Sequence, residues 1–268
     1  MIIEIFGPQG VGKTTFCRAL AGRLQQQGQT VDLVLSYRPA ERFVRNSRGP
    51  SVRAPAAAVA IRIARPAIEL LAMTLHPLAY WRDLDTSAKL LRALPPRTLV
   101  SSIRLSQYIL RLSHSWRLAS ASSHISLFDQ AFVQVVSSLL LSSRSGGETS
   151  IECALDVIPK SDMLIRLDAP ADILSARLHD RQRRQSPAER MLEVDPEFNS
   201  GEIRVFDWLH DLLRKRGQAV TCFSSFDPNS LDDAVTEIAD QVRASLRAPL
   251  QRPCTVRECF PNESLPHA

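Results

Sequence analysis

Short apolar runs alternate along the chain with longer segments in which apolar side chains recur at helical spacing. The runs suited to strands are 2–6, 30–36, 124–129, 162–168 and 218–224. Spacing of three to four residues predicts helices over 13–27, 54–94, 98–118, 130–142, 171–184, 198–216 and 230–246. Residues 143–150, which are rich in serine and glycine, are expected to form a loop.

This order of elements predicts the fold class. Strands that alternate with helices form a parallel sheet with helices on both faces. We therefore expect a three-layer α/β fold with a five-stranded parallel sheet in a single domain over 1–248, followed by an irregular proline-containing tail over 249–268. Ligands of such sheets bind beyond the carboxyl ends of the strands. The loops that follow the strands, together with Asp129, are expected to share that rim.

The segment after the first strand carries the strongest chemical signal. Residues 7–15 read GPQGVGKTT, which has the G-x-x-x-x-G-K-T spacing of the P-loop NTPase fold, and they lie between a strand and a helix. Glycines let backbone N–H groups converge on an anion, and the helix that opens at Lys13 adds its positive end. Lys13 is expected to reach the β- and γ-phosphates of ATP, and Thr14 to hold Mg²⁺. The expected cofactor-binding residues in this loop are Gly7, Pro8, Gln9, Gly10, Val11, Gly12, Lys13, Thr14 and Thr15.

Asp129 ends the third strand and is expected beside the phosphate loop. There its carboxylate could bind Mg²⁺, directly or through water, or accept a proton from the acceptor; capping of the next helix is the structural alternative. The following residue, Gln130, is not acidic, which argues against efficient activation of water and so against ABC- or AAA-type ATPases. The sequence also lacks the N-K-x-D string with which GTPases recognise guanine.

A basic run over 177–190, RLHDRQRRQSPAER, predicts a lid over about 177–192. Arg177, Arg181 and Arg184 fall on one helical face. Such a cluster can close over phosphates, because guanidinium groups donate paired hydrogen bonds to phosphoryl oxygens. A solvated charged helix is the alternative. We expect Arg177 to bind the cofactor.

These motifs resemble those of the nucleoside monophosphate kinase group, and most closely those of thymidylate kinase. GPQGVGKTT is similar to that family's phosphate loop, LFDQAF to its D-R-Y/H element, and RLHDRQRRQSPAERMLE to its lid. Because the phosphate loop holds no arginine, the resemblance implies a catalytic arginine from the lid. The catalytic set is then Lys13, Asp129 and Arg181 or Arg184. Dimers are usual in that family, so the resemblance also implies a homodimer.

The departures from that family all concern the acceptor. Gln130 stands where the family has an arginine for the acceptor phosphate, SYRPAER stands in place of R-E-P-G, and the helical acceptor region over 46–123 is longer than in the family. The acceptor therefore stays open between a nucleotide, a nucleoside, a sugar and another small molecule. The residues expected to bind it are Arg38, Arg42, Arg104 and Gln130. Tyr80, Trp81 and Trp116 either stack on a ring of the acceptor or pack between helices.

Composition limits the possible partners and location of the protein. The net charge of +5 fits polyanionic nucleotides, but no basic block is interleaved with aromatic residues, so nucleic acid is not an expected partner. The five cysteines form no C-x-x-C pair and no signal peptide precedes the first strand, so we expect a cytoplasmic protein with reduced thiols. Charged residues interrupt the apolar stretch 54–75, so no membrane span is expected. The alternative to a kinase is a P-loop ATPase or nucleotide switch with a protein partner.

Overall fold

The computed structural model describes residues 1–35, 77–143, 147–184, 198–224 and 227–247. Within them, five parallel strands form one sheet in the order β2-β3-β1-β4-β5. The strands are β1 (Ile2–Phe6), β2 (Val31–Val34), β3 (Ile125–Phe128), β4 (Met163–Asp168) and β5 (Val220–Ser224). These strands confirm the five runs expected from the sequence, and the central strand, β1, is buried along its whole length.

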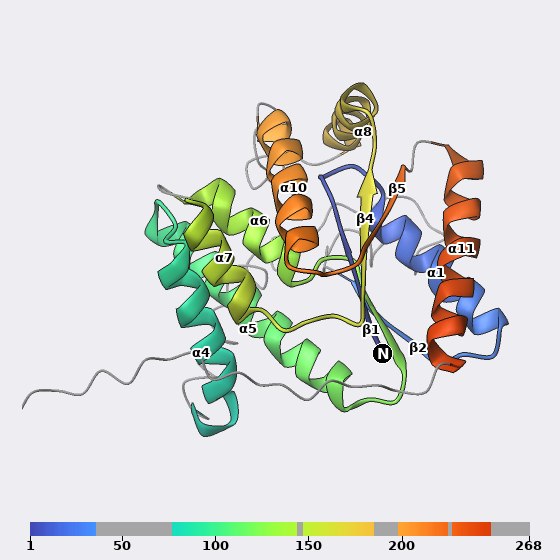
Figure 1. Ribbon diagram of the computed structural model, residues 1–268. Helices are drawn as coiled ribbons and strands as arrows, with labels where there is room; N and C mark the ends of the chain where they lie inside the picture. The colour runs from blue at the N-terminus through green and yellow to red at the C-terminus, as the bar shows by residue number, and fades with distance from the viewer. Residues whose placement is uncertain (36–76, 144–146, 185–197, 225–226, 248–268) are drawn as a thin grey trace, which may run out of the picture.

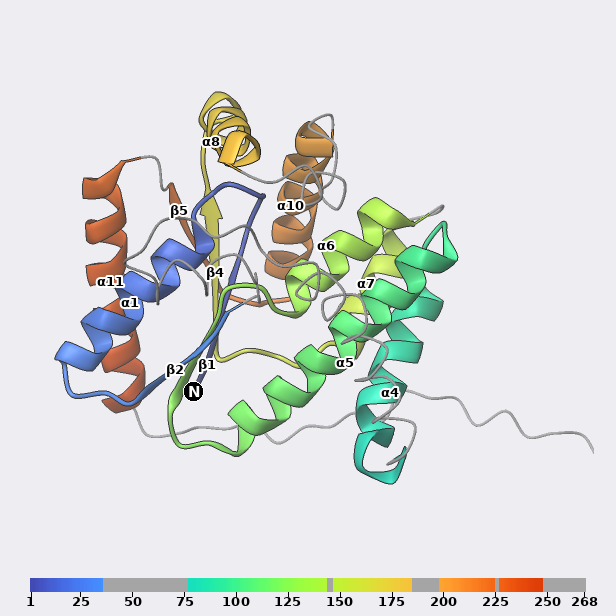
Figure 2. The ribbon, with the colours of Figure 1, turned by 180° about the vertical axis from the view of Figure 1, so that it is seen from behind.

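Helices cover both faces of the sheet, as Figures 1 and 2 show from opposite sides. One face is covered by α1 (Lys13–Gln26) and α11 (Pro228–Arg247). The other face is covered by α4 (Pro77–Ala93), α5 (Leu99–Ala121), α6 (Phe132–Ser142), α7 (Glu148–Val157) and α10 (Phe198–Lys215). The remaining helix of the described regions, α8 (Ala171–Arg184), follows β4 and lies beyond the carboxyl end of that strand. This arrangement confirms the three-layer α/β fold.

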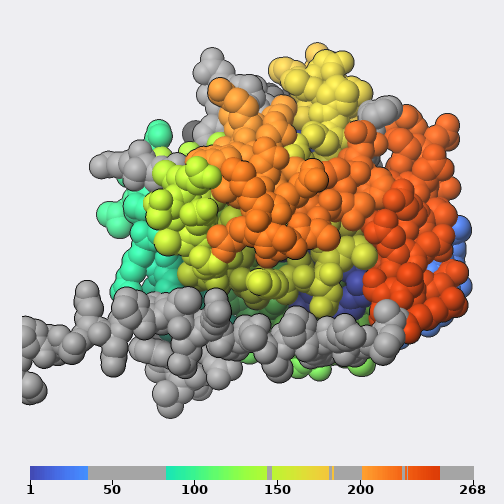
Figure 3. All heavy atoms as spheres, viewed as in Figure 1, coloured from blue at the N-terminus to red at the C-terminus, as the bar shows by residue number. Residues whose placement is uncertain are grey.

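Alternation along the strands divides the core between the two faces. In β1, Ile3 and Ile5 pack with α1 and α11, whereas Ile2 and Phe6 point to the face that α6 and α10 cover. Figure 3, which has the view of Figure 1, shows α10 in orange and α11 in red, and the two helices lie on opposite faces of the sheet. Side chains of a strand point alternately to its two faces, so the even-numbered residues of β1 point toward α6 and α10. This places Glu4 on the same side as Phe6.

The structure corrects one of the predicted elements. The loop expected over 143–150 is wrong at its end, because α7 begins at Glu148. The acidic side chain of Glu148 suits the positive end of a helix, and Ile151, Ala154 and Leu155 give α7 a buried face. Of the helical segment expected over 54–94, the described part is α4; residues 54–76 lie outside the described residues, as does the tail over 249–268.

Trp116 is a core residue. Its ring centroid lies 5.1 Å from that of Phe128 and 5.3 Å from that of Phe132, and its side chain is buried. Packing between helices is therefore its role. The side chains of Tyr80 and Trp81 lie outside the described part of the structure. None of the described helices is both long and apolar enough to span a bilayer.

Candidate active site

The loop between β1 and α1 has the conformation that its glycines allow. Gly7, Gly10 and Gly12 have φ values of 146°, 83° and 99°, in the region that side-chain-bearing residues rarely adopt. At Gly7 a Cβ atom would lie 2.2 Å from the carbonyl oxygen of Leu167 in β4. The glycine at this position is therefore required both by its φ value and by the close approach of the neighbouring strand.

Helix α1 begins directly after this loop, at Lys13. Gly12 is its N-cap, and among the described residues no side chain caps this helix end. The first backbone N–H groups of a helix have no partner within the helix and suit an anion. Lys13 is only 7% exposed, and its ammonium group donates to the carbonyl oxygens of Gly7, at 2.5 Å, and Pro8, at 2.9 Å. Its charge is thus held at the mouth of the loop.

Thr14 and Asp129 meet behind the loop. The Thr14 hydroxyl donates to Oδ2 of Asp129 over 2.7 Å, and Asp129 is fully buried. The two residues are 115 positions apart in the chain but follow neighbouring strands, β1 and β3. No group of three or more His, Cys, Asp and Glu side chains forms a metal cage in the described regions. A hydroxyl and one carboxylate nevertheless fit Mg²⁺, which is commonly held by one or two protein oxygens together with phosphates.

Helix α8 lies over the loop. The Arg177 guanidinium donates to the carbonyl oxygens of Gly10, at 3.4 Å, and Val11, at 3.3 Å. A Cβ atom on Gly10 would lie 3.3 Å from the side chain of Leu178. The helix that carries the predicted lid arginines is therefore packed on the phosphate loop. The backbone of Arg181 and Arg184 belongs to α8, whereas their side chains lie outside what the structure describes.

Glu4 is a buried acid that sequence reasoning missed. It is 1% exposed, and its Oε1 accepts the backbone N–H of Val133 at the start of α6 over 2.6 Å. Burial raises the pKa of Glu4 to about 8, although the hydrogen bond from Val133 lowers it. The signal was a single charged residue inside the apolar strand sequence IIEIF.

Tyr108 joins this group from α5. Its hydroxyl is buried and has no hydrogen-bond partner among the described residues. Burial raises the pKa of Tyr108, and the negative charges of Asp129 and Glu4 raise it further. A phenol O–H that can donate thus lies close to two carboxyl groups on the side of the sheet where α5 and α6 pack.

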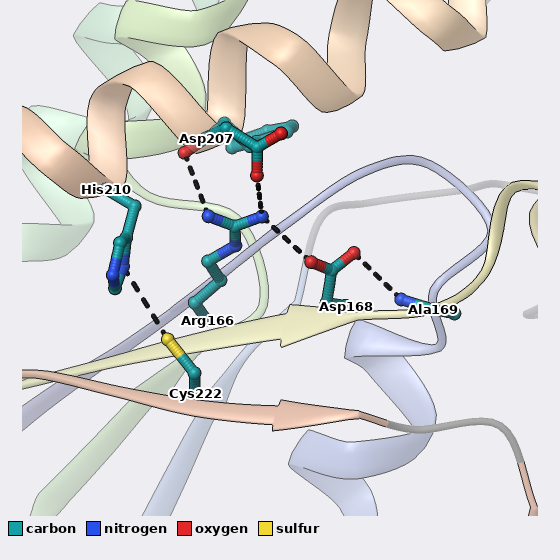
Figure 4. A network of polar contacts seen from close by, with 7 residues as sticks. Arg166, Asp168, Ala169, Asp207, His210 and Cys222 are labelled. Carbon is teal, nitrogen blue, oxygen red and sulfur yellow. Dashed lines mark hydrogen bonds and ion pairs between the residues drawn. The ribbon is translucent and has the colours of Figure 1, made fainter.

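A second missed group connects α10 to the sheet and to the phosphate loop. Figure 4 shows the Arg166 guanidinium of β4 between Asp168, at 2.8 Å, and Asp207 of α10, at 2.5 Å. Five residues before Asp207 on the same helix, Glu202 is 4% exposed and accepts the backbone N–H of Gln9 over 3.2 Å. No motif in the sequence marks Glu202 as part of the site. Its signal is its place on the apolar stripe of the helix.

The structure brings together some of the predicted site residues. The loop residues, Asp129 and Arg177 form one group of contacts; Gln130 follows Asp129 and is half-buried. Thr15 is exposed on α1, and Arg104 is exposed on α5, four residues before Tyr108, outside this group of contacts. Arg38 and Arg42 lie outside the described residues.

Comparison with known proteins supports the fold. No protein-family model and no curated protein matches the sequence. Among solved structures, the chain is similar to deoxyadenosine kinase from M. mycoides with bound dATP, with 13% identity, a TM-score of 0.50, and coverage of 90% of this chain and 100% of that chain. It is also similar to the same enzyme with the products dCMP and a flexible dCDP bound, with 13% identity, a TM-score of 0.49, and coverage of 91% and 100%. The chain therefore has the three-layer α/β fold that such P-loop kinases share.

Proposed function

We propose that this protein is a P-loop phosphotransferase that moves the γ-phosphoryl group of ATP to a small acceptor of the nucleoside or nucleotide class. The observation that carries this proposal is the contact between Thr14 and Asp129 directly behind a glycine-rich loop. A hydroxyl at the start of a helix and a carboxylate at the end of an adjacent strand form the protein half of a Mg²⁺–nucleotide site.

The residues of the loop have distinct roles in this proposal. Backbone N–H groups between Gly7 and Lys13 bind the phosphates, and the Lys13 charge lies where the β- and γ-phosphates would be held. Thr14 and Asp129 would hold Mg²⁺, which supplies positive charge to the phosphate oxygens. The site then acts mainly by positioning and by fixed charge, which is how phosphoryl transfer is generally catalysed.

Arginines of α8 complete the proposed site. Arg177 fixes α8 against the phosphate loop through two carbonyl oxygens. Arg181 and Arg184 follow one and two turns later on the same helix, so we assign to them the stabilisation of the transferred phosphoryl group. Closure of this segment would also exclude water, which limits hydrolysis of ATP.

The acceptor is expected on the side of the sheet where α5 and α6 pack. Glu4, Tyr108 and Asp129 bring polar groups together there. One solved structure with this fold is a deoxyadenosine kinase with bound dATP, which makes deoxynucleosides reasonable first acceptors. The sequence resemblance to thymidylate kinase adds dTMP. With ATP as the donor, we expect the enzyme to act in the cytoplasm.

An acceptor panel tests the proposal. ADP release from Mg-ATP is followed by a coupled assay with deoxynucleosides, nucleosides, nucleoside monophosphates including dTMP, and sugars, against a reaction without acceptor. Stimulation by one class of acceptor supports a kinase and identifies its substrate. Binding of ATP with slow release of ADP that no acceptor accelerates would contradict the proposal and favour a nucleotide switch with a protein partner.

A further inference from the structure

Glu202 lies on the face of α10 that otherwise carries buried apolar side chains. Phe206, Leu209 and Leu213 follow it at the fourth, seventh and eleventh positions, which lie on one helical face, and all three are buried. Glu202 begins this face and is itself only 4% exposed. A carboxylate at such a position loses hydration, which disfavours its charged form.

The end of α10 that carries Glu202 is fixed in place. Arg166 donates to the backbone carbonyl of Phe206, at 3.4 Å, and to the Asp207 carboxylate, at 2.5 Å (Figure 4). The Phe206 ring lies 6.1 Å, centroid to centroid, from that of Phe6, at the end of β1. These contacts, one turn after Glu202, hold its carboxylate at the phosphate loop.

The contacts of Glu202 belong to the phosphate loop. Its Oε2 accepts the Gln9 backbone N–H over 3.2 Å. Burial raises the pKa of Glu202, while the positive charge of Lys13 and the hydrogen bond from Gln9 lower it. Of the two elements that pack most against α10, α6 carries no charged or titratable group and β5 carries Cys222. The charged groups of the neighbouring strands are Glu4, Arg166 and Asp168, Asp129 follows β3, and α8 contributes Arg177 among its several charged side chains.

A carboxylate is not what this contact needs structurally. A glutamine at position 202 would accept the same N–H without burying a charge, and one N–H uses only one of the several acceptor sites of a carboxylate. Titratable groups held at such a cost near a binding site are candidates for proton transfer. Asp129 is in a different position, since the Thr14 hydroxyl already bonds to it. The two carboxylates therefore have separate surroundings and suit separate roles.

We propose that Glu202 is the catalytic base that takes the proton from the acceptor, and that the acceptor is therefore a hydroxyl group, as in a nucleoside. This inference rests on the proposed phosphotransferase function. The hydroxyl oxygen forms a bond to the γ-phosphorus while the bond from that phosphorus to the β,γ-bridging oxygen breaks. ADP leaves with the electron pair, and the hydroxyl proton passes to the Glu202 carboxylate and then to solvent. An acceptor phosphate has a second pKa of about 6 and would need no such base.

The test compares the wild type with Glu202→Gln, Glu202→Asp and the control Asp211→Asn, which removes an exposed carboxylate from the same helix. Three readouts are needed: the melting temperature, the affinity for Mg-ATP by calorimetry, and kcat/KM between pH 5 and pH 9 with nucleoside and nucleoside monophosphate acceptors. We expect Glu202→Gln to fold and to bind Mg-ATP within about threefold of the wild type. We expect its transfer to a nucleoside hydroxyl to fall by about 10²- to 10⁴-fold.

The pH profile separates a base from a merely structural residue. Wild-type kcat/KM should fall as the pH drops through the pKa of Glu202, and Glu202→Gln should lose that acid limb while Glu202→Asp and Asp211→Asn keep it. Wild-type rate and an intact acid limb in Glu202→Gln would overturn the inference and leave the kinase proposal standing. Transfer to nucleoside monophosphates alone would also overturn it. If the wild type transfers phosphate to no acceptor, both proposals fail.

Discussion

Replacement of Glu4 by glutamine should make the protein more stable at neutral pH. Glutamine has the same shape, and its carbonyl oxygen can accept the N–H of Val133 as Oε1 of Glu4 does. It cannot ionise, however. The difference in stability between the two proteins therefore measures the cost of ionising Glu4, whose pKa is determined mainly by its burial on β1.

The size of this effect follows from the pKa of Glu4 in the folded protein. Burial raises that pKa from 4.5 to about 8, so between these values the unfolded chain releases a proton that the folded chain keeps. The free energy of unfolding then falls by about 1.4 kcal/mol for each unit of rising pH. Between pH 5 and pH 7 the wild type should lose roughly 3 kcal/mol that the glutamine variant does not lose.

Urea unfolding at pH 5 and pH 7 measures this difference. We expect Glu4→Gln to gain roughly 3 kcal/mol on the wild type between the two pH values, whatever its stability at pH 5. Glu237→Gln, which changes an exposed carboxylate on α11, is the control and should show no comparable gain. A constant difference between Glu4→Gln and the wild type at both pH values would refute the reasoning, because Glu4 would then be ionised in the folded protein.

Two further predictions concern the loop and α10. Gly7→Ala should weaken Mg-ATP binding at least tenfold and lower the melting temperature, because its Cβ would meet the Leu167 carbonyl oxygen at 2.2 Å. Gly22→Ala in α1, which meets nothing within 4 Å, is the control and should stabilise the protein by about 0.5–1 kcal/mol. Phe206→Ala should cost about 3–5 kcal/mol in chemical unfolding, because the side chain is fully buried; a cost below about 1 kcal/mol would contradict the packing of α10.

The sequence contained most of the fold because local patterns determine it. Strand β1 and helix α8 begin and end at the expected residues. An apolar run and a helical period of apolar side chains are both visible in a short stretch of sequence. Helix α7 was missed because its first residues follow a stretch of serines and glycines, whose loop signal is local, whereas the burial of Ile151 and Leu155 depends on tertiary packing.

The site divides in the same way. The phosphate loop follows from spacing alone, and Asp129 follows from its place at the end of a strand. Glu202 and Arg166 could not be found in this way, because their contacts join distant parts of the chain. Glu202 contacts Gln9, 193 positions away, and Arg166 contacts Asp207, 41 positions away. A charged residue on an otherwise apolar stripe is the one signal that the sequence offers for such contacts.

The transfer of a labelled γ-phosphoryl group tests the central claim most directly. ATP labelled on its γ-phosphorus is incubated with Mg²⁺ and a nucleoside and nucleotide mixture, and the products are separated for the wild type and for Lys13→Ala. We expect the label on an acceptor with the wild type, and at least a hundredfold less with a folded Lys13→Ala, because the buried charge at the loop is lost. Label only in inorganic phosphate, or equal transfer by both proteins, would contradict the account.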